Sequence, residues 1–318
     1  MSGPAFRTLD VVEYGRAERV APGLRRVIAE NPSKFTYRGT GTYLLGDGDV
    51  VVIDPGPLLD SHRDALAAAL AGERVRGILV THCHADHSPL ARWLSAETGA
   101  PTFGFGPPPR PDPELEPERD DSTGDADADD TVIEEATDHD FVPDHAVVHG
   151  EVLDLAPVVT VEAVHTPGHT SNHTCWATEL DGVRTLFSGD HVMGWSTTVV
   201  SPPDGDMAAY IASLQLVVDR ADDVLWPTHG PPRDDVVEYV SALVEHRRAR
   251  DRAVLEVVRS GPTTIPEVVA VLYADVREEL HKPAGRSVWA HLVQLVAAGD
   301  VAVEGGGPAR LDATYRPV

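Results

Sequence analysis

The sequence predicts an α/β fold with two strand-rich halves, each carrying helices, followed by a different kind of tail. Three observations support this prediction. Short runs rich in β-branched residues alternate with segments of helical periodicity, Asp-Gly turns join neighbouring runs, and about seventy residues at the end show three helical patterns and a hairpin. No Gly-rich phosphate loop lies between the two halves.

In the first half, residues 36–45 and 49–54 are predicted strands, because a Gly-Asp-Gly turn at 46–48 separates two β-branched runs. Residues 62–71 are rich in Ala and Leu, which predicts a helix. The short apolar run at 75–80 predicts a buried strand.

In the second half, residues 158–164, 174–180 and 183–187 are predicted strands, the last two joined by an Asp-Gly turn. Residues 206–219 predict an amphipathic helix, and residues 224–227 a further strand. The apolar positions of this helix recur on one face at Met207, Ile211, Leu214 and Val218.

The tail predicts helices over 234–258, 265–273 and 286–298, then a hairpin, an order typical of a winged-helix module. From Arg250 to the last residue there are 8 basic and 9 acidic residues, so a packing or lid module is favoured over DNA reading. We expect a catalytic domain over 1–245 and a winged-helix-like domain over 246–318.

An acidic insertion interrupts the catalytic domain. Residues 107–151 hold 16 acidic residues against Arg110 and Arg119. The part from 107 to 140 is rich in Pro and Asp and poor in large apolar side chains, which predicts a solvated surface insertion before structure resumes near Phe141. A calcium loop is the less supported alternative, since the Asp-Ala-Asp-Ala-Asp run at 125–129 lacks the Gly and closing Glu.

Composition limits the partners. The 318 residues include 51 Asp and Glu against 26 Lys and Arg, a formal charge of −25, which opposes broad contact with RNA, DNA or an anionic membrane. No apolar run is long enough for a transmembrane helix, and the first residues do not resemble a secretion signal. Two cysteines, Cys83 and Cys175, are predicted to be buried thiols, and they suit a reducing compartment. A cytoplasmic protein is therefore expected.

The chemistry is carried by the segment from His82 to His87, which follows a predicted strand and contains His82, His84, Asp86 and His87. Such a cluster would be costly in a core without a metal, because buried polar groups need partners. On a turn, His82 and His84 can face one cation while Asp86 and His87 face a neighbouring one. Imidazole and carboxylate ligands suit zinc, and also iron or manganese.

This motif and three later strand-end motifs resemble the metallo-β-lactamase superfamily. The later motifs are Thr-Pro-Gly-His169-Thr, Phe-Ser-Gly-Asp190-His and Pro-Thr-His229-Gly-Pro, and the resemblance covers roughly residues 20 to 245. It implies a four-layer αββα sandwich in which His169 completes the first metal site, Asp190 bridges both sites and His229 completes the second. The tail is similar to the winged-helix extension of some members, including lactamase-like endoribonucleases.

The resemblance also implies two divalent metal ions, with zinc preferred and iron or manganese as alternatives. Two such ions can hold a hydroxide between them and polarise a carbonyl or phosphoryl oxygen. By the same resemblance, Asp86 is the catalytic residue, which ligates the second ion and accepts or shuttles the proton of the attacking water. Asp54 is the candidate for orienting the imidazoles, and His173 and His191 are predicted hydrogen-bonding residues rather than ligands.

The leading hypothesis is a dinuclear metal-dependent hydrolase that acts on a small ester, thioester or related acyl substrate. The alternative is a phosphodiesterase or endoribonuclease, which the tail favours and the charge disfavours. His281, Lys282 and Arg286, just before the predicted third tail helix, could bind an anionic part of a substrate. Asp190 in place of a soft ligand disfavours antibiotic hydrolysis.

A third hypothesis, a DNA-binding regulator with a structural metal site, is the least supported, because the ligand set is complete. The residues after His87 and Asp190 depart from glyoxalase II and the persulfide dioxygenases. A small-molecule substrate is expected, no membrane association is expected, and a homo-oligomer is left open.

Overall fold

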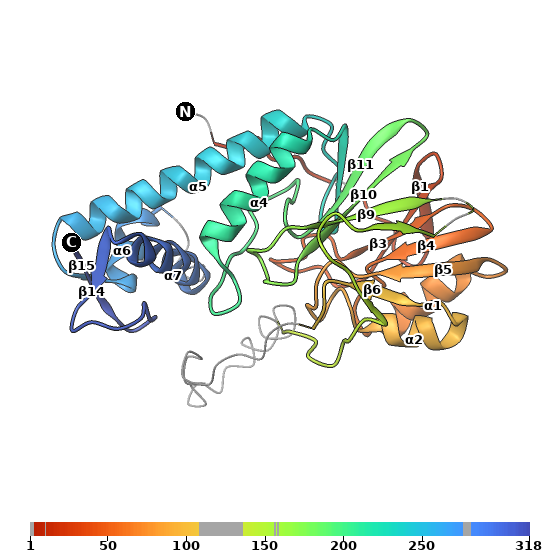
Figure 1. The fold of residues 1–318 in the computed structure, drawn as a ribbon, viewed down its shortest axis with the longest axis horizontal. Helices are drawn as coiled ribbons and strands as arrows, with labels where there is room; N and C mark the ends of the chain where they lie inside the picture. The colour runs from red at the N-terminus through yellow and green to blue at the C-terminus, as the bar shows by residue number, and fades with distance from the viewer. Residues whose placement is uncertain (1–2, 10, 108–135, 156, 158, 276–280) are drawn as a thin grey trace.

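The computed structural model describes residues 3–9, 11–107, 136–155, 157, 159–275 and 281–318. Most of the predicted insertion over 107–140 lies outside these residues. The described part of the chain forms two large sheets with helices on their outer faces and a smaller three-stranded sheet in the tail (Figure 1).

The larger sheet has seven strands in sequential order. They are β1 (Ala17–Ala21), β2 (Leu24–Ile28), β3 (Gly41–Leu45), β4 (Asp49–Ile53), β5 (Arg74–Leu79), β6 (Thr102–Gly104) and β7 (His145–Ala146). The first four pair antiparallel and the next three join in parallel.

The second sheet has five strands, in the order β12, β11, β10, β9, β8. Their bounds are β8 (Val152–Asp154), β9 (Thr160–His165), β10 (Thr174–Leu180), β11 (Val183–Gly189) and β12 (Val224–Pro227). Neighbours pair antiparallel except β11 and β12, which are parallel.

Successive side chains of a strand point to opposite faces of the sheet, and this alternation produces the layers. In β4, Val50 and Val52 face α1 (Asp60–Ala69) and α2 (Leu90–Thr98) in one core cluster, whereas Val51 and Ile53 face the second sheet in another. On the far side, α4 (Met207–Arg220) and α5 (Val236–Arg259) pack on the second sheet around residues such as Leu186. The molecule therefore has the expected order of helix, sheet, sheet and helix.

The tail forms a separate core. It comprises β13 (Thr263–Thr264), α6 (Ile265–Leu272), α7 (His281–Ala298), β14 (Val301–Val303) and β15 (Thr314–Pro317). Val254 and Val258 at the end of α5 pack into this core with Trp289 and Tyr315. Helices followed by a small sheet confirm the predicted winged-helix module.

One helix belongs to both parts. The 24 residues of α5 pack first on the second sheet and then in the tail core, so the predicted boundary between residues 245 and 246 falls inside it. Ala290 of α7 joins the core cluster formed by α4 and α5, and α7 contacts α4. Figure 1 shows α5 running from α4 out to the winged-helix module.

The structure corrects several sequence predictions. Residues 36–40 are not part of a strand, because Tyr37 and Gly39 have φ of 59° and 117°, outside the extended region. The third tail helix begins at His281 rather than residue 286, so His281, Lys282 and Arg286 lie within its first turns. The elements β1, β2, α2 and β6 were not expected. No helix among the described residues has the length and apolarity needed to cross a membrane.

Candidate metal centre

The topology brings the candidate ligands to one end of both sheets. Strands β4 and β5 run parallel, and so do β11 and β12. Strand β9 runs in the same direction as β11, because both pair antiparallel with β10. Asp54, the 82–87 loop, His169, Asp190 and His229 follow the carboxyl ends of β4, β5, β9, β11 and β12, so they meet at this edge.

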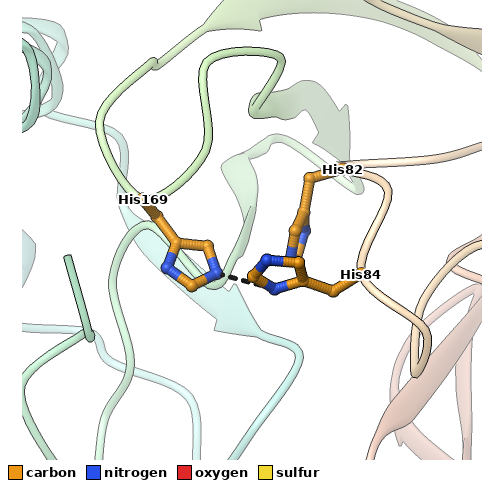
Figure 2. Close-up of side chains that lie close together, drawn as sticks. All are labelled: His82, His84 and His169. Atoms are coloured by element: carbon orange, nitrogen blue, oxygen red, sulfur yellow. Dashed lines mark hydrogen bonds between the residues drawn. The ribbon is translucent and has the colours of Figure 1, made fainter. Parts of the chain in front are cut away.

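A first group of candidate ligands consists of His82, His84 and His169, whose ligand atoms lie within 4.8 Å of one another. His169 Nε2 lies 3.2 Å from His84 Nδ1. Figure 2 shows the His84 and His169 rings next to each other, joined by the dashed line, with His82 behind them on the same loop as His84. The planes of the His84 and His169 rings are 86° apart. Three imidazole nitrogens directed at one point are a common set for zinc.

A second group consists of Asp86, His87 and His229, also within 4.8 Å of one another and all buried. Asp86 Oδ2 lies 3.4 Å from His87 Nε2 and 3.2 Å from His229 Nε2. The second group lies beside the first, since the rings of His82 and His87 have centroids 4.0 Å apart.

Asp190 lies between the two groups. Its Oδ1 is 3.7 Å from His87 Nε2 and 3.4 Å from His229 Nε2, whereas its Oδ2 is 3.9 Å from His169 Nε2. One carboxylate therefore presents a different oxygen to each group.

Hydrogen bonds on the far side of the rings orient them. The Nδ1 atoms of His169 and His229 face the carbonyl oxygens of Val199 at 2.7 Å and Gly39 at 3.3 Å. A carbonyl oxygen only accepts, so each Nδ1 carries a proton and donates it outward. Each Nε2 points into the cluster and is the atom that can bind a cation when it carries no proton.

The contacts of Asp54 agree with its predicted role of orienting the imidazoles. Its Oδ2 lies 2.9 Å from His87 Nδ1 and accepts from Thr81 Oγ1 at 2.7 Å, while its Oδ1 accepts from the Thr81 amide at 2.8 Å. Thr81 Oγ1 in turn lies 3.1 Å from His82 Nδ1. One buried carboxylate thus fixes a histidine from each group, and Thr228 adds a further bond at 3.2 Å.

The donor atoms fit divalent ions. His82 Nε2, His87 Nε2 and Asp190 Oδ1 are buried and make no hydrogen bond to any described residue. Leaving three such atoms unsatisfied in one place is costly, and cations coordinated by them would remove that cost. The imidazole and carboxylate donors suit zinc, iron or manganese.

Electrostatics differ between the two groups. Burial, with the neighbouring imidazoles, lowers the pKa of His82 well below its ordinary value and that of His84 to about 3. These rings are neutral at pH 7 and so are ready to act as ligands.

In the second group, burial alone would lower the pKa of His87 and His229, but the carboxylates of Asp86 and Asp190 reverse the effect. The pKa of His87 is raised well above its ordinary value, and that of His229 is raised to about 10. Burial likewise opposes ionisation of Asp86 and Asp190, yet these two imidazoles lower the pKa of both carboxyls. A cation entering the second group must therefore displace protons from its imidazoles.

Other predicted residues have definite places. His173 accepts a hydrogen bond at Nε2 from the Asp190 amide at 3.2 Å, as its predicted supporting role requires. Cys83 and Cys175 are buried thiols whose pKa burial raises to about 12. Arg286 reaches Ser201 Oγ at 3.5 Å, and Lys282 is exposed.

Three supporting features were not anticipated from sequence. Thr40 Oγ1 donates to Asp86 Oδ2 at 2.8 Å, and Gly39 and Val199 contribute only carbonyl oxygens. The last part of the predicted insertion is not simply solvated but pairs with the 82–87 loop. The amide of Ala85 donates to the Ala136 carbonyl at 2.8 Å, and the amide of Asp138 donates to the Cys83 carbonyl at 2.6 Å. Carbonyl groups occur at every position, so sequence carries no signal for these roles; Thr40, close before a strand, carries a weak one.

Comparison with known proteins identifies the family. A family profile described as the metallo-beta-lactamase superfamily matches residues 37–229, more than half of the chain. The chain belongs to this superfamily. A profile described as the beta-lactamase associated winged helix domain matches residues 264–309. The protein is thus a metal-dependent hydrolase of the metallo-beta-lactamase superfamily with a winged-helix tail.

Several relatives of this metallo-beta-lactamase superfamily member extend over most of its length. A beta-lactamase-like protein 2 homolog of Caenorhabditis elegans is 30% identical over 81% of this chain and 79% of its own. An atrochrysone carboxyl ACP thioesterase of Aspergillus chevalieri is 28% identical over 84% of this chain and 78% of its own. The crystal structure of a beta-lactamase domain protein from Burkholderia ambifaria has a TM-score of 0.73 at 24% identity, covering 97% of this chain and 95% of its own.

Proposed function

We propose that the protein is a dinuclear hydrolase that cleaves a small ester or thioester. The observation that carries the proposal is the position of Asp190, with one carboxylate oxygen toward His169 and the other toward His87 and His229. His82, His84 and His169 would hold one ion, Asp86, His87 and His229 the other, and Asp190 both. Bound divalent ions lower the pKa of water and polarise an acyl oxygen, which supplies the nucleophile and the electrophile at neutral pH.

The protein's own groups determine which leaving groups suit the site. Asp86 is the proposed proton acceptor for the attacking water, and its carboxylate is fixed by Thr40 and flanked by His229. Its lowered pKa means that it is seldom protonated near neutral pH, so it rarely has a proton to give to a poor leaving group. Thiolates and activated alkoxides leave without a strong acid, whereas amines do not. This favours thioesters and esters over amides.

The relatives and the charge support the same substrate class. One relative is named as a thioesterase. This centre could serve either acyl-ester or phosphodiester hydrolysis. The formal charge of −25 slows the approach of a polyanion, so RNA is less favoured as a substrate than a small ester or thioester. We also propose that Lys282 and Arg286, in the first turns of α7, contact an anionic part of the substrate.

The test begins with metal content. The purified full-length chain, loaded with zinc, iron or manganese, is expected to hold close to two ions by elemental analysis. Asp190→Ala should lower both occupancy and turnover, because one carboxylate serves both groups. Asp219→Asn, at an exposed position on α4, is the control and should keep both. Wild-type protein that retains only trace metal after reconstitution would contradict the proposal.

Substrate class is tested on the same preparation. Short-chain acyl thioesters should release thiol faster than the matched amides release amine. Turnover of a model phosphodiester or a short RNA in preference to every thioester and ester would favour the endoribonuclease alternative. Lys282→Ala combined with Arg286→Ala should raise KM for acyl groups bearing a carboxylate more than for neutral ones.

A further inference from the structure

The loop from Asp190 to Val199 supports two candidate ligands at once. Asp190 itself lies between the two ligand groups, and the Val199 carbonyl accepts from His169 Nδ1 at 2.7 Å. Between them, Thr198 Oγ1 donates to the Asp190 carbonyl at 2.7 Å. A displacement of this loop would therefore move a bridging carboxylate and the far side of one histidine together.

A buried arginine holds this loop in place. The guanidinium of Arg247, in the middle of α5, donates from NH2 to the Thr198 carbonyl. The side chain is only 4% exposed, and its guanidinium lies over the Tyr210 ring, 5.3 Å from the centroid. The Tyr210 hydroxyl donates to the His191 carbonyl at 2.9 Å, so both partners of the cation–π contact also bind the loop.

The surroundings of Arg247 are unusual for a buried charge. Among the described residues, no carboxylate lies within 4 Å of it, and its Nε makes no hydrogen bond. The carboxylate one turn further along α5, Asp251, lies instead 2.6 Å from His291 of α7. A buried guanidinium without an ion pair is costly, and a well-packed apolar side chain at such a place is often neutral or stabilising. Stability alone therefore does not account for an arginine at this position.

We propose that Arg247 is a positioning residue for the metal centre. By holding the Thr198 carbonyl, it fixes the loop that places Asp190 and orients His169. The inference rests on the proposed dinuclear centre and adds to it a specific dependence: the ion bound by His82, His84 and His169 relies on α5, the helix shared with the winged-helix module.

The dependence is selective because the second group has other supports. His87 is fixed by Asp54, Asp86 by Thr40, and His229 by Gly39, all of which precede the 82–87 loop in the chain and none of which belongs to the 190–199 loop. Only Asp190 is common to both groups. Loss of the Arg247 contact should therefore weaken the first ion more than the second.

The experiment compares metal affinity in the full-length chain, measured by competition with a chromogenic chelator. Arg247→Met keeps the length and buried surface of the side chain while removing its donors. It should weaken the first ion about tenfold, in the range found for outer hydrogen-bond partners of metal ligands, and leave the second within about twofold. Arg248→Met, at the exposed neighbouring position, should match the wild type.

A readout that does not depend on turnover separates positioning from general stability. The absorption spectrum of the cobalt-loaded protein should shift in Arg247→Met, while the thermal midpoint of the metal-free protein changes little. Arg247→Lys, which keeps one donor, should recover part of the affinity. Wild-type affinity and spectrum in Arg247→Met would overturn the inference, and so would an equal loss of both ions together with a large fall in the metal-free midpoint.

A second variant guards against misfolding of the first. Thr198→Val removes the hydroxyl that donates to the Asp190 carbonyl but keeps the Thr198 carbonyl itself. It should weaken binding at the first group as well, because the same loop carries Asp190 and the Val199 carbonyl, and wild-type affinity in both Thr198→Val and Arg247→Met would overturn the inference. If the wild-type protein binds two ions and only the variants behave unexpectedly, the positioning role fails while the proposed function stands. A wild-type protein that binds no ion overturns both.

Discussion

Single histidines in this protein have very different roles according to their surroundings. His62 is buried away from the ligand groups, where its Nε2 lies 2.9 Å from Thr42 Oγ1. Burial lowers its pKa from 6.5 to about 4. His229, equally buried, lies beside Asp190 and Asp86 and has its pKa raised to about 10. The difference follows from neighbouring carboxylates rather than from burial.

The pKa of His62 predicts a dependence of stability on pH. The His62 imidazole binds a proton near pH 6.5 in the unfolded chain but only near pH 4 in the folded chain. The free energy of unfolding therefore decreases as the pH falls through this window. The full loss is about 3 kcal/mol. His62→Gln should reduce the fall in unfolding free energy between pH 7 and pH 5, measured in urea. An unchanged slope would contradict this, and His149→Gln, at an exposed histidine, is the control.

At the scale of the element, the short segment before β3 shows how backbone shape supports the centre. Gly39 has a φ of 117°, and a Cβ there would lie 2.0 Å from the Ala29 carbonyl oxygen. This close approach directs the Gly39 carbonyl at His229 Nδ1 and places Thr40 beside Asp86. The glycine is thus needed twice, for its conformation and for its lack of a side chain.

Gly39→Ala should therefore be costly in two measurable ways. We expect a loss of about 2 kcal/mol or more in unfolding free energy, from the clash and the unfavourable φ together. We also expect weaker binding of the ion that we propose for Asp86, His87 and His229. Gly48→Ala is a matched control, because its φ is also positive at 80° but nothing lies within 4 Å of the added carbon. It should lose only about 1 kcal/mol and bind both ions normally. Equal behaviour of the two variants would show that the contact with Ala29 is unimportant.

Elements with a strong local signal were predictable from sequence. The hairpin of β10 and β11 was expected at its Asp-Gly turn and is observed there, and α4 begins after Asp206, whose side chain accepts from the Ala209 amide. By contrast, two charged residues interrupt the apolar residues of each of β1 and β2, so these strands do not alternate regularly. Helix α2 follows closely on the histidine motif, and its pattern was not distinct either.

The candidate site divides in a similar way. His82, His84, Asp86 and His87 are visible because four such side chains in one turn are rare, and Asp54 because it ends an apolar strand. The carbonyls of Gly39 and Val199 and the contact from Arg247 depend on tertiary position. No local pattern reports which carbonyl will face a histidine, and an arginine within a helix resembles many exposed ones.

At the scale of the whole molecule, α5 joins the two parts without a linker. Tyr239, Val240 and Leu243 pack on the second sheet, and Val254 and Val258 pack in the tail core. Because these two sets of side chains belong to one continuous helix, the directions in which they point relative to each other depend on the number of residues between them.

Inserting one alanine after Arg248 should uncouple the two cores. The added residue turns everything beyond it by about 100° and moves it by about 1.5 Å, so Val254 and Val258 no longer face the tail core while α7 stays packed on α4. Calorimetry should show a lower or split transition relative to Arg248→Ala, which changes the same place without changing the length. A single transition at the wild-type temperature would mean that the modules tolerate rotation.

Because residues 136–138 pair with the 82–87 loop, hydrogen exchange at this pairing should report whether metal ions are bound to the loop. The Asp138 amide is bonded to the Cys83 carbonyl, between the first two candidate ligands, so its proton exchanges with solvent only when that loop opens. Ions that bind the loop should slow this exchange markedly, while the Gly299 amide in the tail, bonded to the Val296 carbonyl, should not respond. Occupancy could then be followed by hydrogen exchange in a mixed sample, without a substrate and without a coloured metal.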